Sequence, residues 1–205
     1  YINGGKGQLV YRGHKIEDVV NGHGFEEVVY LLWNARYPNA DELQAFKLAL
    51  AAERALPVYL KEILDRLPHH MDMVSVVRTA VSCLTLEGPS YPPTQAQAMA
   101  VLAKIPTMIT YVYNRRQGRS EVEPNLAYGH VQNYLYMLQG KVPEEAHVKA
   151  LEAYLILSSD HDMNASTFTA RVVTSTESDI ISAITAAIGA LKGPLHGGAP
   201  SEVDN

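Results

Sequence analysis

The sequence predicts an all-α protein, and three observations lead to this prediction. Apolar residues recur at spacings of three and four along most of the 205 residues, which is the period of one face of an α-helix. Strand patterns are nearly absent: QLVY at 8–11 is one candidate, so we expect at most one short N-terminal hairpin. Hydrophobic residues make up 47% and charged residues 19% of the chain, which is enough apolar material for a sizeable core.

The helical pattern divides into eight segments, with loops expected at 88–95, 118–125 and 140–145. Asp41 is a candidate N-cap for the second segment. Pro106 lies inside the fourth, where its missing amide should kink the helix. The apolar positions define the segments 25–32, 41–50, 74–84, 99–113, 134–138, 148–155, 164–176 and 180–191.

The last two segments differ from the others in their second face. The segment 164–176 places Phe168 and Val172 on an apolar face, and 180–191 has small residues opposite its apolar face. We expect both helices to be enclosed on two sides. The small residues allow a close approach either within one chain or across a dimer interface.

Composition excludes several classes of function. The formal net charge of −5 argues against a nucleic-acid or anionic-membrane surface, because both need a basic patch. The longest apolar stretch has about nine residues, whereas a membrane span needs about 20. A single cysteine, Cys83, allows no intrachain disulfide and is typical of the cytoplasm. Because the chain starts at Tyr1 and stops at Asn205, just after a helix-start signal, we expect a piece of a longer polypeptide.

His196 is the strongest candidate for chemistry in the sequence. It lies in ALKGPLHGGAP at 190–200, between a Gly-Pro and a Gly-Gly pair. Glycines permit unusual backbone geometry and leave room for a ligand, and a packing residue would not need such a setting. We therefore favour a functional role for His196.

A second histidine, His161, lies in SSDHDMNAS at 158–166. Asn164 is the expected N-cap of the following helix, whose first turn favours anions. A structural role for His161 remains an alternative. No metal site is expected, because neighbouring residues such as Asp160 and Asp162 rarely converge on one ion.

Four segments share a pattern with one enzyme family. They are DHDMNASTFTARVVTSTESDIISAITAAIGALKGPLHGGA at 160–199, GQLVYRGHKIEDVV at 7–20, FEEVVYLLWNARYPNADEL at 25–43 and HMDMVSVVRTAVS at 70–82. Together they resemble the citrate synthase family, and the first is the most specific. The resemblance implies a large helical domain, a smaller helical domain and a homodimer. It implies condensation of acetyl-CoA with oxaloacetate to give citrate and CoA, with acetyl-CoA as co-substrate and no tightly bound cofactor.

The resemblance also implies roles for individual residues. His196 matches the catalytic histidine that hydrogen-bonds the acetyl-CoA carbonyl as the enolate forms, and His161 matches an oxaloacetate-binding histidine. Asn164 and Arg78 are further substrate-binding candidates. We expect His161 and His196 to face one cleft. The segment along which CoA lies matches Leu191, Lys192, Gly193, Pro194 and Leu195.

Parts of the family pattern are missing from 1–205, which we interpret as a partial large domain. The second catalytic histidine, the catalytic aspartate, the carboxylate-binding arginines and the small domain are expected beyond Asn205, so this segment alone should be inactive. One alternative is 2-methylcitrate synthase, which uses propionyl-CoA, because one methylene changes binding by only about 1–3 kcal/mol. Another is a non-catalytic helical dimerisation module, which would not need the setting of His196.

Overall fold

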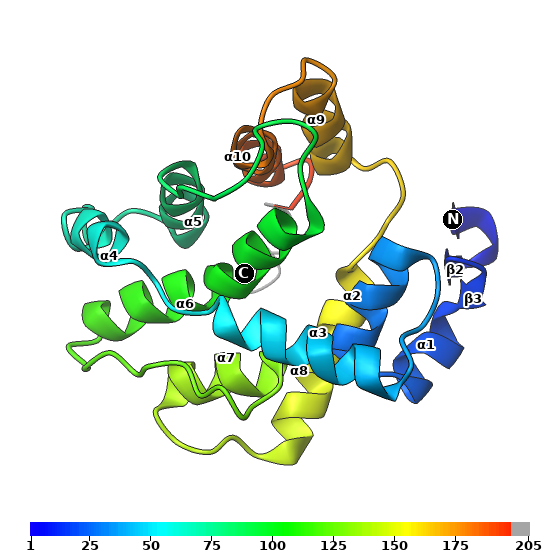
Figure 1. Cartoon of the computed structure of the whole chain (residues 1–205), viewed down its shortest axis with the longest axis horizontal. Helices are drawn as coiled ribbons and strands as arrows, with labels where there is room; N and C mark the ends of the chain where they lie inside the picture. Colours follow the sequence, from blue (N-terminus) through cyan, green and yellow to red (C-terminus); the bar gives the residue numbers. More distant parts are fainter. Residues whose placement is uncertain (198–205) are drawn as a thin grey trace. The chain divides into compact units, whose positions relative to one another are not determined.

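The computed structural model describes residues 1–197, and α-helices dominate them (Figure 1). This confirms the predicted fold class. A small sheet of β1 (Ile2–Asn3), β2 (Gln8–Tyr11) and β3 (His14–Lys15) begins the chain, with a 3₁₀ helix, Gly4–Lys6, after β1. The α-helices of the described residues are α1 (Ile16–Gly22), α2 (Phe25–Asn34), α3 (Ala40–Ala52), α4 (Val58–Asp65), α5 (Met73–Ser82), α6 (Gln95–Arg116), α7 (His130–Gln139), α8 (Glu145–Ser158), α9 (Ala165–Thr174) and α10 (Ile180–Leu191).

The sheet has one strand more than the single hairpin we expected. Its strands are antiparallel and follow the order β1-β2-β3, with Ile2 opposite Leu9 and Val10 opposite Lys15. Two glycines allow the tight turns that connect these strands. Gly7 (φ 61°) precedes β2 and Gly13 (φ 92°) precedes β3, and both adopt backbone angles that other residues disfavour.

All eight expected helical segments are present, together with α1 and α4, which the sequence analysis missed. These two span only seven and eight residues, too short for an apolar repeat to stand out. Pro106 lies inside α6, which continues through it. The carbonyl of Pro106 accepts a hydrogen bond from the Thr110 hydroxyl at 2.9 Å.

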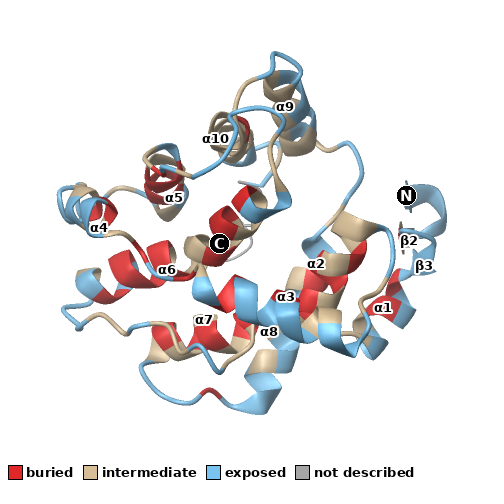
Figure 2. Cartoon of the chain, viewed as in Figure 1, coloured by how far each residue is buried: buried red, intermediate tan, exposed pale blue. Residues whose placement is uncertain are grey.

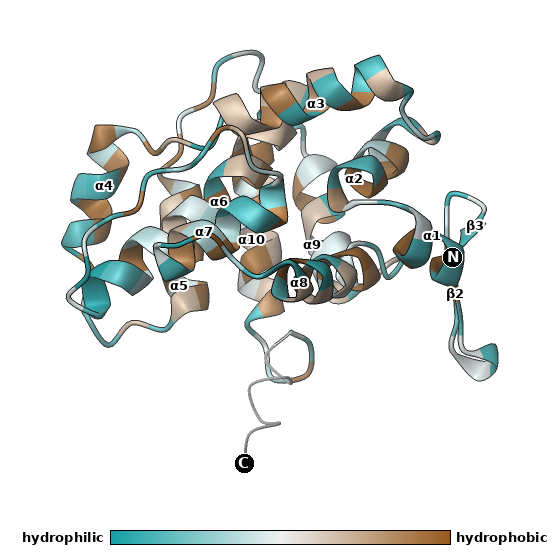
Figure 3. Ribbon diagram, turned by 90° about the horizontal axis from the view of Figure 1, so that it is seen from below, coloured by the Kyte–Doolittle hydropathy of each residue, from teal (hydrophilic) through white to brown (hydrophobic). Residues whose placement is uncertain are grey.

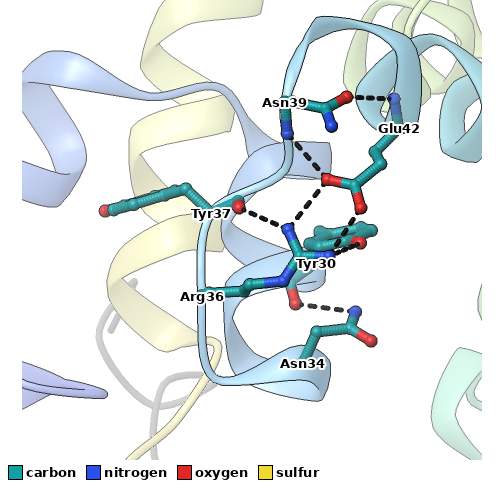
Figure 4. A network of polar contacts seen from close by, with 6 residues as sticks. All are labelled: Tyr30, Asn34, Arg36, Tyr37, Asn39 and Glu42. Atoms are coloured by element: carbon teal, nitrogen blue, oxygen red, sulfur yellow. Dashed lines mark hydrogen bonds and ion pairs between the residues drawn. The ribbon is translucent and has the colours of Figure 1, made fainter.

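The predicted cap of α3 was wrong by two residues. Asn39, not Asp41, is the N-cap, because its side chain accepts the Glu42 amide at 2.9 Å. The Glu42 carboxylate accepts the Asn39 amide in return at 2.8 Å and also binds the Arg36 guanidinium (Figure 4). This ion pair raises the pKa of Arg36 and lowers the pKa of Glu42 to about 2. Asp41 lies in the first turn, where negative charge is also favourable.

The chain forms two compact units. Unit 1 consists of residues 1–54 and 121–162, and unit 2 consists of 55–120 and the residues from 163 onward. Unit 1 therefore contains His161, whereas Arg78, Asn164 and His196 belong to unit 2. The interpretation of 1–205 as a partial large domain stays a prediction.

Unit 2 has an apolar core between α4, α5 and α6 (Figure 2). Apolar and hydrophilic residues alternate along α4 (Figure 3), and Leu60 and Leu64 are its buried positions. Isoleucines of α10 pack on this core. The other core members include Val76, Ala80, Val81, Val101, Met108 and Val112.

The prediction for the last two helices holds only in part. The helix α10 packs against both α5 and α9 within the chain. The prediction for α9 was wrong within the described residues: Phe168 is 59% and Val172 50% exposed. Amphipathic spacing identifies an apolar face, but it does not say which segment covers that face.

Unit 1 is organised by buried polar groups as well as by apolar packing. Gly129, the N-cap of α7, has no side chain to cap the helix, and the buried Glu26 of α2 accepts the His130 amide at 2.7 Å instead. Arg54 is almost fully buried and donates to the Asn125 carbonyl at 2.9 Å.

Across residues 1–197 no helix combines the length and apolar character needed to cross a membrane.

Candidate active site

His196 lies on a tight turn that follows α10. Lys192 caps the helix, the Gly193 amide bonds the Ala190 carbonyl at 3.1 Å, and the His196 amide bonds the Gly193 carbonyl at 3.0 Å. A Cβ atom at Gly197 would lie 2.7 Å from the Leu191 carbonyl oxygen. The turn therefore folds back so closely on the helix end that only glycine fits at 197.

The imidazole of His196 contacts the first turn of α9. Its Nε2 lies 2.8 Å from the Ser166 hydroxyl oxygen, and this oxygen lies 3.1 Å from the Ala187 carbonyl of α10. Ser166 thus joins the ring to two helices and fixes its orientation. The side chain of His196 is half-buried. The helix-start signal near the end of the chain, at 199–202 directly after this histidine and glycine pair, lies outside the described residues.

Asn164 is the N-cap of α9, as predicted, because its side chain accepts the Thr167 amide at 2.9 Å. It therefore orients the helix turn that carries Ser166. Arg78 lies on α5, and its Cδ would be 3.9 Å from a Cβ at Gly189 of α10. The arginine stem therefore lies next to α10 at Gly189, at a distance that would be an ordinary van der Waals contact for a side chain there. Asn164, Arg78 and His196 thus all depend on the packing around α10.

The expected CoA segment divides into an anchored and an open part. The Lys192 ammonium donates to the Asp72 carboxylate at 2.8 Å and to the Ser75 hydroxyl at 2.6 Å. This contact is the main reason that the pKa of Asp72 is well below its usual range. Asp72 also caps α5, so the pair ties the end of α10 to the start of α5. Leu191, Pro194 and Leu195 are exposed, Leu195 completely.

His161 occupies the turn between α8 and α9. Its Nε2 donates to the Leu157 carbonyl at 2.8 Å, because a carbonyl oxygen can only accept. In the neutral ring Nδ1 is then an acceptor. Asp162 adopts a φ of 60°, and its amide donates to the Asp160 carboxylate at 2.9 Å. His161 is exposed and belongs to unit 1, so its predicted cleft with His196 stays a prediction.

Sequence reasoning missed two positioning residues, Tyr11 and Ser166. The Tyr11 hydroxyl lies 2.8 Å from the Ile156 carbonyl and accepts the Asp160 amide at 3.1 Å. It therefore holds the end of α8 at the turn that carries His161. Burial raises the pKa of this phenol. Both residues lie in family-like segments, and Ser166 follows the predicted cap by two positions, which is the only local signal.

Residues 1–197 show no group of three His, Cys, Asp or Glu side chains that could hold a metal ion. The arrangement around His196 instead offers a fixed imidazole next to an exposed loop. A ring held at one nitrogen can present its other nitrogen to a ligand. This chemistry matches polarisation of a carbonyl group.

Comparison with known proteins identifies the family. A family model described as citrate synthase, C-terminal domain, matches residues 1–205. The chain belongs to the citrate synthase family. Among curated relatives, a 2-methylcitrate synthase of Mycobacterium tuberculosis is 43% identical over 198 residues, which cover 95% of this chain and 50% of the relative. Citrate synthase 2 of Bacillus subtilis is 44% identical over 200 residues, which cover 93% of this chain and 53% of the relative.

Solved structures agree with this assignment. Citrate synthase of Thermotoga maritima matches all of this chain and 55% of its own, with a TM-score of 0.90 and 36% identity. Citrate synthase of Thermoplasma acidophilum, solved in a ternary complex with carboxymethyl coenzyme A and oxaloacetate, has a TM-score of 0.87 and 29% identity over 96% of this chain and 53% of its own. This family member therefore spans about half the length of the relatives it matches.

Proposed function

We propose that the protein containing this chain is a citrate synthase, a transferase that condenses acetyl-CoA with oxaloacetate to give citrate and CoA. The observation that carries this proposal is the 2.8 Å contact between Ser166 and His196, on a turn whose sequence matches the family. A thioester α-carbon is a weak acid, so its enolate must be stabilised as it forms. A fixed donor aimed at the developing oxyanion contributes about 10²–10³ in rate.

The role of His196 sets a condition on the Ser166 hydrogen. A neutral imidazole that donates from Nδ1 must accept at Nε2. The Ser166 hydroxyl has one hydrogen and two acceptors within reach, Nε2 and the Ala187 carbonyl. In the proposed mechanism this hydrogen points to Nε2, which leaves the Nδ1 hydrogen for the acetyl-CoA carbonyl.

We assign the substrate contacts by resemblance and by exposure. His161 is the proposed oxaloacetate contact, because its ring is exposed and anchored by the Leu157 carbonyl. Asn164 and Arg78 are further substrate-binding candidates. The open residues of 191–195 are proposed to lie along CoA, with no tightly bound cofactor. The remaining catalytic groups are expected beyond Asn205, so residues 1–205 alone should be inactive.

Two kinetic variants of the full-length protein test these roles. His196→Ala should lower kcat about 10²–10³-fold with little effect on oxaloacetate binding, because the donor acts on charge that develops in the transition state. His161→Ala should instead weaken oxaloacetate binding, because the dicarboxylate is present throughout the reaction. Steady-state kinetics separates the two. Near-normal turnover of His196→Ala at saturating substrates would overturn the assignment.

The second candidate activity is that of a 2-methylcitrate synthase, which takes propionyl-CoA. Its support is the 43% identity to a curated 2-methylcitrate synthase, close to the identity with citrate synthases. The ratio of kcat/KM for acetyl-CoA and propionyl-CoA, measured on the full-length protein, decides between them. The expected discrimination is about 1–3 kcal/mol for one methylene.

We also propose a cytoplasmic homodimer. The exposed Phe168 and Val172 of α9 provide apolar surface, and segments 70–86 and 94–117 are further interface candidates. The single Cys83 fits a reducing compartment. Light scattering of the full-length protein should give twice the monomer mass, and a monomeric mass would contradict this proposal.

A further inference from the structure

Unit 2 contains a hollow lined by three arginines. It has a volume of about 340 Å³ and lies between the C-terminal part of α6 and the segment that ends α4. Arg115, Arg116 and Arg119 line it together with His69 and Asp65. None of them is among the candidate active-site residues. The lining thus contains three guanidinium groups and one carboxylate, in a chain whose net charge is −5.

Arg115 is held in place by two neighbours. Its Nε lies 2.7 Å from the Asp65 carboxylate, which also accepts the Tyr111 hydroxyl at 2.9 Å. The guanidinium lies over the Tyr111 ring at 5.6 Å. A guanidinium has five N–H donors, and this contact uses the one on Nε. The group is thus orientated before a ligand arrives, with the donors of its terminal nitrogens left for another partner.

The end of α6 brings the other two arginines to the same hollow. Gly118 adopts a φ of 68°, and the chain reverses so that the Arg119 amide bonds the Asn114 carbonyl at 2.8 Å. Arg119 lies over the Tyr113 ring at 5.2 Å. The Arg116 Nη2 is 3.4 Å from the Pro68 carbonyl. Residues far apart in sequence therefore combine to line one hollow.

Stabilisation of the helix end accounts for only part of this arrangement. Cations in the last turn of a helix interact favourably with its macrodipole, which explains Arg115 and Arg116. It does not explain Arg119, which follows the helix, or the hollow itself. The negative end of the dipole disfavours anions, so attraction for an anion must come from the side chains.

We propose that this hollow binds a small, multiply charged oxyanion. Guanidinium groups match the oxygen geometry of phosphates and carboxylates with paired hydrogen bonds. The volume lies at the lower end of the range for small-molecule sites. This inference goes beyond the proposed function and does not depend on it.

Calorimetric titration of the full-length protein with tripolyphosphate tests the proposal. The triple variant Arg115→Gln/Arg116→Gln/Arg119→Gln should bind at least tenfold more weakly than the unmodified protein. The control Lys6→Gln/Lys47→Gln/Lys141→Gln removes the same charge from exposed positions and should change Kd less than twofold. His196→Ala should bind as the unmodified protein does, which separates this result from the fate of the proposed function.

Two further measurements keep the test decisive. If the triple variant does not fold, Arg116→Gln alone should weaken binding about threefold, because it removes one of the three guanidinium groups that would donate charged hydrogen bonds to the anion. Titration with benzene-1,3,5-tricarboxylate shows whether carboxylates bind as phosphates do; arginine-dependent binding of either anion supports the site. Equal weakening in the arginine and lysine variants, or no binding of either anion, would overturn the proposal.

Discussion

His130 and His196 are placed in opposite environments by the same chain. His130 is 5% exposed, stacks on Phe25 at a ring distance of 5.1 Å and lies near the buried Arg54. Burial, with a smaller contribution from Arg54, lowers its pKa to about 4. His196 is half-buried on a turn, with one ring nitrogen bound to Ser166. One histidine is packed into a core, and the other is held at an opening.

The comparison separates an altered pKa from a chemical role. Perturbed pKa values are enriched at active sites, but structural burial produces them as well. His130 has a strongly lowered pKa, yet its surroundings in unit 1 are the capping groups of α7. A reacting group needs an accessible atom and a fixed orientation, and His196 is the better candidate on both grounds.

Truncation of His130 should have the largest effect on stability. His130→Ala removes a buried ring from its stack on Phe25, which should lower the free energy of unfolding by about 3 kcal/mol. Urea unfolding of the full-length protein measures this change. His147→Ala, at an exposed position of α8, is the control and should change the free energy by less than about 0.5 kcal/mol. A small effect at His130 would break the comparison.

The pH dependence of stability should depend on the same residue. The folded pKa of about 4 lies below the pKa of about 6.5 of an unfolded imidazole. Between these values the unfolded chain binds a proton that the folded chain does not. The contribution of His130 to the free energy of unfolding is therefore complete above pH 6.5 and is lost as the pH falls towards 4. Arg54 is the charged group that contributes to this shift, and the Glu26 carboxylate binds the backbone amide of His130.

His130→Phe keeps an aromatic ring against Phe25 but cannot titrate. Between pH 7 and pH 4.5 the unmodified protein should lose about 2–3 kcal/mol more stability than this variant. Urea unfolding at both pH values provides the measurement. Parallel pH profiles would show that folding does not lower the pKa of His130.

Ser166→Ala tests the other half of the comparison. It removes the hydroxyl that orients His196, so kcat should fall about tenfold, the equivalent of one hydrogen bond of about 1.4 kcal/mol. Oxaloacetate KM and stability should change little. Thr169→Ala, in the same helix, removes a hydroxyl that bonds the Ala165 carbonyl of its own helix and is the matched control. Equal kinetics for the two variants would contradict the positioning role.

The smallest effect is expected at Lys192. Its ammonium and the Asp72 carboxylate are about half exposed, with side-chain exposures of 44% and 51%. Exposed ion pairs contribute about 0–1 kcal/mol, so Lys192→Met should change stability by less than about 1 kcal/mol. Activity should change less than about threefold. A loss of activity as large as that of His196→Ala would identify Lys192 as part of the reaction site.

The sequence predicted features that depend on neighbouring residues. Eight helices, the Asn164 cap and the unusual setting of His196 all follow from local spacing and from glycine and proline chemistry. The roles of Ser166 and Tyr11 were not predictable, because each depends on a contact with a distant segment. Ser166 contacts His196 30 positions away, and Tyr11 contacts Asp160 149 positions away. The exposure of Phe168 was missed for the same reason, because periodicity does not identify the covering segment.

The bond between Tyr11 and the turn of His161 also sets an order of events during synthesis. Tyr11 leaves the ribosome early, whereas Asp160 follows 149 residues later. At about 5–20 residues per second, this interval is roughly 7–30 s. Unit 1 is interrupted by residues 55–120, so its first segment must wait while another unit emerges. The turn that carries His161 is therefore expected to acquire its final geometry late in translation, after most of this chain has been made.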